Sequence, residues 1–449
     1  MEWNNKRVLV FGAGISGIGA ARLLLQAGAV PVIYDGKADL DREALLRKIG
    51  SDVEICAGEL PEEVRASLDL VVMSPGVPTD LPLVKSLYAQ GLKVWGEIEL
   101  AYEVGRGEVL AITGTNGKTT TTALLGKIMG DARESVYVVG NIGTPYTSVA
   151  LETREDTVTV AEISSFQLET IEKFAPKVSA ILNITPDHLN RHHTMEEYIR
   201  VKELITENQT PENVCVLNYE DPVLREFGEK AVPKVVYFSS RRPLPEGIYL
   251  EGDEIILKTE TETVPVVRTG DLKLLGLHNY ENVMAAVAMA YYAGVSMESI
   301  RKSTCEFTAV EHRIEYVTEK NGVAYYNDSK GTNPDAAIKG IQAMNRPTYL
   351  IGGGYDKSSS YEEWIGAFDG KVKELVLIGQ TREKIRDTAE RMGFHSCVLC
   401  EDLREAVAYC ASRASAGDAV LLSPACASWG QFDNYEQRGR MFKEYVRSL

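Results

Sequence analysis

The chain has 449 residues, of which 44% are hydrophobic, enough for ordinary packed cores in about three domains. Its formal net charge of -16 argues against a surface that binds nucleic acid or an anionic membrane, because such partners select for exposed Lys and Arg. No apolar run is long enough to span a membrane, and MEWNNKRVLV lacks the regions of a signal peptide, so we expect a cytoplasmic protein.

Apolar, β-branched stretches alternate with amphipathic helical stretches along the whole chain. This alternation predicts an α/β fold with parallel sheets flanked by helices. Three blocks of domain size can be separated. The first runs to about residue 96, the second contains a β-rich polar insert near residues 235–268, and the third starts around residue 310.

A glycine-rich turn follows the first strand, at residues 8–11. Gly12, Gly14 and Gly17 fit G-x-G-x-x-G before a helix, and Asp35 ends the next strand. The glycines let the backbone approach a diphosphate, and the acid can accept hydroxyl or ring N–H groups of a nucleoside. NAD, FAD and a nucleotide sugar fit equally well, and a packing turn without a ligand stays an alternative. The segment MSPGVP follows a later strand and is expected to line the same crevice.

A second glycine-rich turn, GTNGKT, lies between the strand EVLAIT and a helix that begins in threonines. A strict Walker A loop requires a glycine where Ile112 stands, so that match fails. The remaining G-x-x-G-K-T pattern still predicts a phosphate site. Backbone N–H groups of residues 115–118 can cradle phosphate oxygens, Lys118 can reach the terminal phosphates, and Thr119 can bind Mg²⁺. A plain flexible turn would leave the lysine and the hydroxyl unexplained.

Polar residues follow the later strands of the second block. Glu162 ends the strand TVTVAE, and Asp187 with His188 follow the strand in AILNITPDH. The carboxyl ends of parallel strands share one sheet edge, so these groups are candidates for a magnesium site beside the loop. The alternative is that such strand-end acids cap the following helices.

The helix TMEEYIRVKELI carries a lysine on its inward face. Met195, Tyr198, Ile199 and Ile205 mark that face, and Lys202 lies on it where an apolar residue is expected. An inward lysine must extend to solvent, pair with an acid, or shift its pKa so that a neutral amine is present. A neutral amine can react with CO₂ to give a carbamate, which is a metal ligand.

The third block contains a strand, a polar loop and a helix in YYNDSKGTNPDAAIKGI. Asn333 is the expected N-cap and Pro334 the first helical residue, which makes the helix start an anion site beside Lys330 and Thr332. A dicarboxylate would suit this site. A plain capping motif is the alternative, but it does not explain the preceding Asp-Ser-Lys.

The seven cysteines are scattered, which indicates reduced thiols rather than a disulfide framework. Cys397 and Cys400 fit C-x-x-C, but the residues between them read as a short strand, and no second pair completes a zinc site.

The motifs GTNGKTTTT, GNIGTP, EISSFQLE, NITPDHLNRH, YIRVK, GLHNYENVMAA, EHRIE and NDSKGTNPDA follow one another along the chain. In this order they resemble the Mur ligases, ATP-dependent amide-forming enzymes of peptidoglycan precursor synthesis. The closing stretch LLSPACASWGQFDNYEQRGRMF is similar to the branch that adds D-glutamate. Folylpolyglutamate synthases share the central loop but lack an N-terminal block of this kind.

The resemblance implies a Rossmann-like domain at 1–97, a central P-loop ATPase-type parallel sheet with a small β insert at 98–309, and a second Rossmann-like domain at 310–449. These would bind, respectively, UDP-N-acetylmuramoyl-L-alanine, ATP with two Mg²⁺, and D-glutamate. The reaction implied passes through an acyl phosphate and releases ADP and phosphate. We further expect a monomer without nucleic-acid or membrane partners.

The same resemblance assigns residues to each ligand. Those that match UDP-substrate contacts are Gly14, Ile15, Ser16, Asp35, Gly36, Lys37, Ser74, Pro75, Gly76, Asn141 and Ser164. Those that match ATP contacts are Gly114, Thr115, Asn116, Gly117, Lys118, Thr119, Thr120, Thr121, Asn279, Arg313 and Asp328. Those that match D-glutamate contacts are Lys330, Thr332, Lys357, Ser428, Trp429 and Tyr435. The implied catalytic residues are Lys118, Glu162, His188 and Lys202, and the implied metal ligands are Thr119, Glu162, His188 and a carbamylated Lys202.

Two positions depart from the family pattern. Tyr355 is inserted in GGGYDKSSS, which places Asp356 directly before Lys357 and leaves the register of their two roles open. Tyr435 stands where phenylalanine is common and adds a hydroxyl.

Three other functions are compatible with parts of the sequence. An NAD-dependent dehydrogenase would use the first turn but leave the second unused. A P-loop switch or motor would use the second turn and hydrolyse ATP without either small substrate. A sibling ligase would use both turns with another amino acid.

Overall fold

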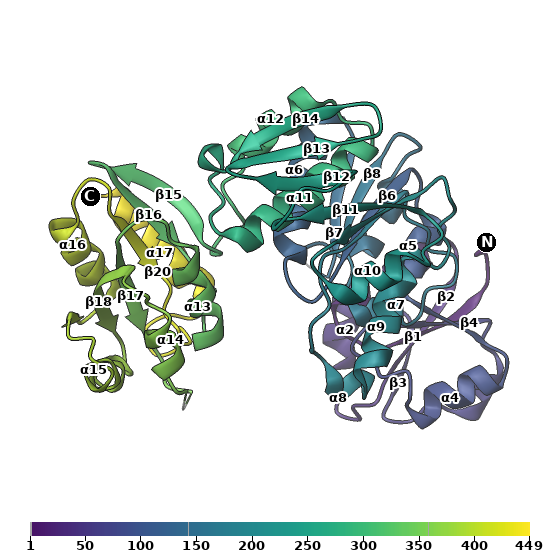
Figure 1. The fold of residues 1–449 in the computed structure, drawn as a ribbon. Helices are drawn as coiled ribbons and strands as arrows, with labels where there is room; N and C mark the ends of the chain where they lie inside the picture. The colour runs from purple at the N-terminus through teal and green to yellow at the C-terminus, as the bar shows by residue number, and fades with distance from the viewer. Residues whose placement is uncertain (1, 142, 358) are drawn as a thin grey trace. The chain divides into compact units, whose positions relative to one another are not determined.

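The computed structural model describes residues 2–141, 143–357 and 359–449. In these residues the strands form three sheets flanked by helices (Figure 1), which confirms the α/β class. The chain divides into two compact units, Met1–Val267 with Glu281–Thr304, and Arg268–Tyr280 with Cys305–Leu449. The domain borders at 97/98 and 309/310 stay predictions.

The N-terminal sheet has the strand order β3-β2-β1-β4-β5 and is parallel throughout. Its strands are β1 (Arg7–Phe11), β2 (Val30–Asp35), β3 (Glu54–Ala57), β4 (Leu70–Met73) and β5 (Lys93–Gly96). Its helices are α1 (Ile15–Gln26), α2 (Arg42–Ile49), α3 (Glu62–Ala66), α4 (Pro82–Ala89) and α5 (Glu97–Val104). Val8 and Val10 pack toward α1 and α5, whereas Leu9 and Phe11 pack toward α3 and α4. Strand order reverses between β1 and β4, which is where ligands bind in such sheets.

The central sheet has the order β14-β13-β12-β11-β10-β9-β6-β8-β7. Its strands are β6 (Glu108–Thr113), β7 (Val136–Gly140), β8 (Val158–Glu162), β9 (Val178–Ile181), β10 (Val214–Asn218), β11 (Lys234–Ser239), β12 (Gly247–Glu251), β13 (Glu254–Lys258) and β14 (Thr263–Arg268). The α-helices of this part are α6 (Lys118–Ala132), α7 (Ser165–Leu168), α8 (Leu189–His192), α9 (Met195–Glu203), α10 (Pro222–Gly228), α11 (Leu277–Tyr292) and α12 (Met297–Glu306). Short 3₁₀ turns are η1 (Tyr146–Ser148), η2 (Ala150–Glu152), η3 (Leu204–Thr206) and η4 (Thr269–Asp271).

The β-rich insert is part of the central sheet rather than a separate layer. β11 pairs in parallel with β10, and β12 with β11, so the parallel sheet continues into the predicted insert. β13 then returns antiparallel to β12, and β14 forms the edge. The predicted insert near residues 235–268 thus corresponds to strands β11–β14, of which β13 is the first to run antiparallel to its neighbour β12.

One hydrophobic core joins the N-terminal and central sheets. It contains Trp95, Ile98 and Leu100 from β5 and α5 together with Val109 and Ala111 from β6. All are nearly or fully buried. Both sheets accordingly belong to the first compact unit.

The C-terminal sheet has the order β15-β16-β20-β17-β18-β19. Its strands are β15 (Glu315–Lys320), β16 (Val323–Asn327), β17 (Thr348–Gly353), β18 (Val372–Ile378), β19 (Cys397–Leu399) and β20 (Ala419–Leu422). Its helices are α13 (Pro334–Ala343), α14 (Glu362–Gly366), α15 (Arg382–Arg391), α16 (Leu403–Arg413) and α17 (Tyr435–Arg447). Core contacts place α13, α14 and α15 on one face and α16 and α17 on the other. β19 confirms the strand predicted between Cys397 and Cys400.

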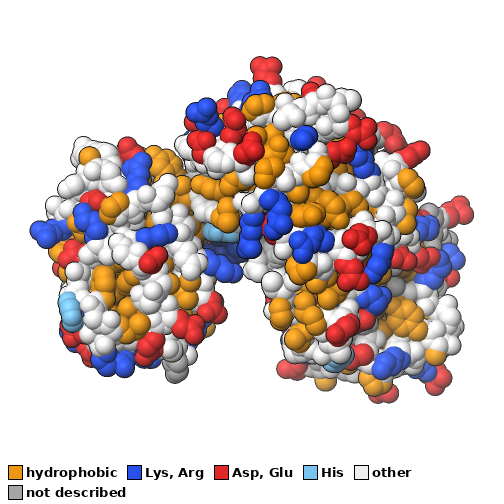
Figure 2. Space-filling model, in the orientation of Figure 1, with side chains coloured by type: hydrophobic (Ala, Val, Ile, Leu, Met, Phe, Trp, Pro, Cys, Tyr) orange, Lys and Arg blue, Asp and Glu red, His pale blue; other side chains and the backbone are white. Residues whose placement is uncertain are grey.

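Figure 2 shows acidic and basic side chains mixed over the visible face of each unit, in keeping with a chain that carries both signs in quantity. No helix in the described part of the chain combines the length and the hydrophobicity needed to cross a bilayer.

Candidate active site

The first glycine turn lies at the switch point of the N-terminal sheet. A Cβ at Gly17 would lie 1.8 Å from the carbonyl oxygen of Gly12, so only glycine permits this approach of α1 to β1. The carboxylate of Asp35 accepts hydrogen bonds from the N–H groups of Ala13 (3.0 Å) and Lys37 (3.0 Å). Asp35 thus braces the turn, in addition to any contact with a nucleoside.

A cavity of about 500 Å³ opens beside this turn. It is lined by Phe11, Gly12, Tyr34, Asp35, Gly36, Gly76, Val77, Pro78, Leu81, Pro82 and Leu83. The segment after β4 therefore shares the crevice with the glycine turn, as predicted. Ile15 is 78% exposed at the start of α1, an unusual position for an aliphatic side chain unless a ligand covers it.

The second glycine turn leads from β6 into α6. Gly117 has φ 88°, and a Cβ there would lie 2.2 Å from Oδ1 of Asn282. Nζ of Lys118 donates to the carbonyl oxygens of Gly114 (2.8 Å) and Thr115 (3.0 Å). Its ammonium group therefore lies against the loop, at the end of the helix where an anion is favoured.

Two of the four backbone N–H groups that were predicted to cradle phosphate donate to another part of the protein instead. The N–H of Thr115 donates to the carbonyl oxygen of Asn183 (2.9 Å), and the N–H of Asn116 donates to Oδ1 of the same residue (2.8 Å). These two donors hold the loop against the segment after β9. The N-terminal turn of α6 is what remains to face a phosphate, because its N–H groups have no acceptor within the helix.

Glu162 is buried next to this loop. It ends β8, where it pairs in register with Ile112 of β6, and it is 1% exposed. Oε1 accepts a hydrogen bond from Nδ2 of Asn141 (2.8 Å), whereas the buried Oε2 has no hydrogen-bond partner in the described residues. A carboxylate oxygen without a donor is costly to bury, so this position fits a divalent cation.

Lys202 is buried, as its inward position predicts. It is 1% exposed, its Nζ donates to the carbonyl oxygen of Gly114 (2.9 Å), and it lies 4.8 Å from the ring centre of Tyr198. Extension to solvent is therefore ruled out. Burial, reinforced by the neighbouring Lys118 ammonium, lowers the pKa of Lys202 to about 7, so a neutral amine is present at neutral pH.

His188 lies at the start of α8 with a half-exposed side chain. Its ring centre is 4.9 Å from that of Phe166, and its Nε2 is 3.6 Å from the carboxylate of Asp187. In the parts of the chain that are described, no three His, Cys, Asp or Glu side chains form a metal-binding group.

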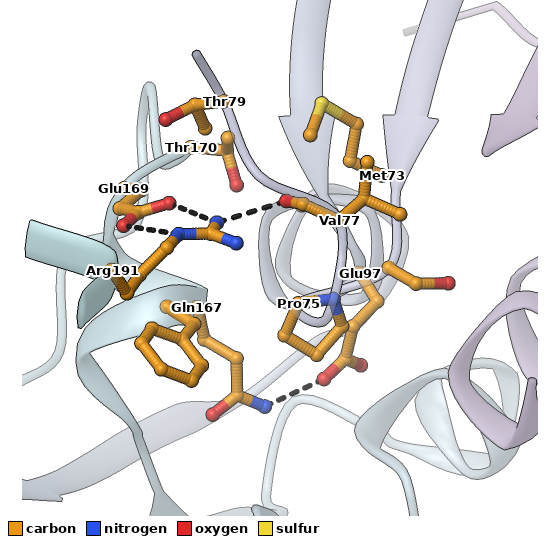
Figure 3. Close-up of a pocket in the computed structure, with 12 residues that line it drawn as sticks. Met73, Pro75, Val77, Thr79, Glu97, Gln167, Glu169, Thr170 and Arg191 are labelled. Carbon is orange, nitrogen blue, oxygen red and sulfur yellow. Dashed lines mark hydrogen bonds and ion pairs between the residues drawn. The ribbon is translucent and has the colours of Figure 1, made fainter. Parts of the chain in front are cut away.

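A buried polar chain connects the N-terminal and central sheets. Nε2 of Gln167 donates to Oε1 of Glu97 (2.7 Å), as Figure 3 shows. Oε1 of Gln167 accepts from the N–H (2.8 Å) and the hydroxyl (2.9 Å) of Ser164. Ser164, a predicted UDP-substrate residue, thus caps α7 two residues after Glu162. Sequence reasoning missed Glu97 and Gln167 because they are 70 positions apart.

We expect Glu97 to make stability depend on pH. Burial raises the pKa of Glu97 to about 7 from 4.5, so its contribution to stability is full below pH 4.5 and is lost as pH rises through 7. Glu97→Gln removes this loss, worth roughly 3 kcal/mol at about 1.4 kcal/mol per pKa unit. The free energy of unfolding of the variant, relative to the unsubstituted protein, should rise between pH 5 and pH 8 in denaturant titrations. An equal difference at both pH values would contradict this.

The predicted anion site in the second unit has the expected local structure. Oδ1 of Asn333 accepts from the N–H of Ala336 (2.8 Å), and Pro334 is the first residue of α13. Lys330, just before this helix, lies 5.4 Å from the ring centre of Tyr435. Ser428 is buried (5% exposed), whereas the next residue, Trp429, is exposed.

The inserted residue Tyr355 packs against the predicted D-glutamate segment. Its N–H donates to the carbonyl oxygen of Ala427 (2.9 Å), and its ring centre is 5.5 Å from that of Trp429. Lys357 lies over the same indole at 5.1 Å, whereas the carboxylate of Asp356 accepts from Nζ of Lys384 (3.1 Å).

The three predicted ATP contacts of the second unit differ in exposure. Asn279 is buried and donates to the carbonyl oxygen of Leu275 (2.7 Å), and Arg313 is exposed. Asp328 is 6% exposed and accepts from the Ser423 hydroxyl (2.6 Å), and burial raises its pKa to about 7.

Comparison with known proteins identifies the family. Residues 6–96 match the model of the Mur ligase MurD-like N-terminal domain, residues 112–290 the Mur ligase middle domain, and residues 312–426 the Mur ligase glutamate ligase domain. The chain belongs to the Mur ligase family.

Full-length relatives carry one shared name. The UDP-N-acetylmuramoylalanine--D-glutamate ligase of Lachnoclostridium phytofermentans is 54% identical over 100% of this chain and 99% of its own length. The protein of that name from Lachnospira eligens is 55% identical over 100% of both chains.

Solved structures resemble the fold at low identity. UDP-N-acetylmuramate-alanine ligase MurC from Thermotoga maritima gives a TM-score of 0.59 at 20% identity, over 99% of each chain. MurF from Acinetobacter baumannii gives 0.61 at 17% identity, over 97% of this chain and 93% of its own.

Proposed function

We propose that this protein is an ATP-dependent ligase that joins D-glutamate to UDP-N-acetylmuramoyl-L-alanine in peptidoglycan precursor synthesis. The observation that carries the proposal is the full-length match, at 54% identity, to a relative named for that reaction. The two glycine turns support it, because they provide separate sites for a nucleotide-linked substrate and for ATP. We place the enzyme in the cytoplasm, as a monomer, in cell-wall synthesis and hence in cell shape and division.

The proposed reaction has two steps. A carboxylate oxygen of the alanine attacks the γ-phosphorus of ATP, the bond to the bridging oxygen breaks, and ADP leaves. The amine of D-glutamate then attacks the carbonyl carbon of the acyl phosphate, and phosphate leaves with loss of an amine proton. Phosphorylation is needed because a carboxylate has no adequate leaving group.

Both steps bring anions together, so positive charge must be held in place. The Lys118 ammonium and the N-terminal turn of α6 would hold the γ-phosphate. Thr119 and Glu162 would hold Mg²⁺, which would offset the negative charge of the phosphate oxygens. Asn141 fixes the orientation of the Glu162 carboxylate through its hydrogen bond.

His188 and a carbamylated Lys202 would hold the second Mg²⁺. The buried, partly neutral amine is suited to react with CO₂. A carbamate keeps one N–H, which could still donate to the Gly114 carbonyl, and its carboxylate would supply an oxygen ligand for the metal.

Arg438 is a positioning residue in the proposed D-glutamate site. It is fully buried on α17, and its guanidinium donates to the Ser329 hydroxyl (2.9 Å), the Ser329 carbonyl (2.8 Å) and the Cys426 carbonyl (3.2 Å). It thereby joins the loop of Lys330 to the loop of Ser428.

We expect Arg438→Lys to raise KM for D-glutamate about tenfold, because a lysine cannot span both loops, and to change KM for ATP less than twofold. Steady-state kinetics with phosphate-release detection measure both. Arg440→Lys, exposed on the same helix, serves as the matched control. A KM for D-glutamate equal to that of the unsubstituted protein would exclude the positioning role.

A coupled assay with ATP, UDP-N-acetylmuramoyl-L-alanine and D-glutamate tests the proposal. ADP should form continuously, in step with the amide product, only when all three are present, because without D-glutamate the reaction stops at the acyl phosphate after one ADP per enzyme. ATP hydrolysis without either small substrate would favour a switch or motor, and activity with another amino acid would favour a sibling ligase. Changes in NADH fluorescence on binding would favour a dehydrogenase.

A further inference from the structure

Arg191 of α8 connects the central sheet to the N-terminal crevice. Its Nη2 donates to the carbonyl oxygen of Val77 (2.8 Å) and to Oε2 of Glu169 (2.5 Å), and its Nε donates to Oε1 of Glu169 (3.2 Å). Figure 3 shows the guanidinium between the two partners. The side chains of Arg191 and Glu169 are 12% and 9% exposed, so water competes little for these bonds.

The two ends of this connection belong to different proposed sites. Val77 follows Gly76, and both line the cavity beside the first glycine turn. Arg191 lies in the first turn after His188, and its N–H donates to the His188 carbonyl (2.9 Å). A shift of the 74–78 segment therefore displaces a side chain whose backbone is hydrogen-bonded to His188.

Phe166 provides a second contact between Arg191 and His188. Its ring centre lies 5.1 Å from the Arg191 guanidinium and 4.9 Å from the ring centre of His188. Nε2 of His192 lies 2.9 Å from the Ser165 hydroxyl. Helices α7 and α8 thus form one packed block that contains His188.

The geometry requires arginine in particular. Its planar fork makes parallel bonds to a carboxylate and a further bond to a carbonyl at one side. A lysine ammonium at the same place could satisfy one partner but could not hold the other.

We propose that Arg191 is a positioning residue that couples occupation of the UDP-substrate crevice to the placement of His188. When the substrate orders the 74–78 segment, the hydrogen bond from Arg191 to Val77 fixes Arg191 and, with it, helix α8. Substrate binding then favours metal binding at His188, and by linkage metal binding favours substrate binding equally. This inference rests on the proposed function, since that function assigns ligands to the two sites.

Calorimetric titration of UDP-N-acetylmuramoyl-L-alanine into the full-length protein without ATP, at low and at high MgCl₂, tests the coupling. The unsubstituted protein should bind the substrate more tightly at high MgCl₂. Arg191→Gln and Arg191→Lys should each weaken binding about tenfold or more at high MgCl₂ and lose most of the magnesium dependence. Arg200→Gln serves as the control, because Arg200 is exposed on α9 and forms its ion pair with Glu197 on the same helix (2.7 Å).

A purely structural role predicts a different result. The melting temperature of the Arg191 variants would fall, while the folded fraction kept the affinity and magnesium dependence of the unsubstituted protein, and this would overturn the proposal. Magnesium-independent binding by the unsubstituted protein would overturn it as well. Amide formation by the unsubstituted protein is measured in parallel, so a failure of the proposed function is seen separately from a failure of the coupling.

Discussion

Lys118→Ala should reduce ADP formation by about a thousandfold or more while the protein still binds UDP-N-acetylmuramoyl-L-alanine. The lysine is the cation of the second glycine turn, and its ammonium already rests on the carbonyl oxygens of Gly114 and Thr115. Loss of a cation that offsets phosphate charge in the transition state has effects of this size. The UDP-substrate crevice is built instead on β1, β2 and β4, so its affinity should change less than threefold.

Two measurements check this division of labour. ADP release is followed in a coupled assay, and substrate binding is followed by calorimetry on the same preparation. Lys127→Ala provides a matched control, since Lys127 lies about two and a half turns further along α6 and forms an ion pair with Asp131 (2.7 Å). Parallel loss of ADP formation and of UDP-substrate binding in Lys118→Ala would contradict separate sites.

Lys202→Ala should be inactive, by about a thousandfold or more, and added formate or acetate should partly restore it. Removal of the buried side chain leaves space beside Gly114 and Tyr198. A small carboxylate in that space would supply the oxygen ligands that a carbamate provides. Phosphate release as a function of carboxylate concentration measures the recovery.

A second substitution at the same position tests whether the recovery depends on the space left by the lysine. Lys202→Met fills the same volume without a metal ligand, so formate should not restore it. Lys230→Ala, which removes an exposed lysine just after α10, should leave activity unchanged. If Lys202→Ala stays inactive at all carboxylate concentrations, the side chain acts as an amine rather than as a carbamate.

Patterns within one segment predicted the fold well. The apolar strands that end at Asp35, Thr113 and Glu162 stand where the periodicity places them, because buried parallel strands are apolar on both faces. Strand β15 was not predicted, since its residues are only half-buried at a sheet edge and EYVTEK lacks a continuous apolar run.

Contacts between distant segments could not be predicted from one sequence. The N–H groups of Thr115 and Asn116 were expected to bind phosphate, but Asn183, nearly 70 residues away, accepts both. Arg191 and Val77 are 114 positions apart, and nothing in either segment indicates the partner. The burial of Lys202, by contrast, could be predicted from its position on the inward face of the helix.

The core shared by the N-terminal and central sheets means that the nucleotide-sugar crevice is not a detachable module. Trp95 is 1% exposed, and its indole N–H donates to Glu172 (2.7 Å), beyond the first sheet. A fragment cut at residue 97 would present that indole and its neighbours to water and would tend to aggregate. Chimaeras of two relatives should therefore tolerate a crossover between the central and C-terminal sheets better than one between the N-terminal and central sheets.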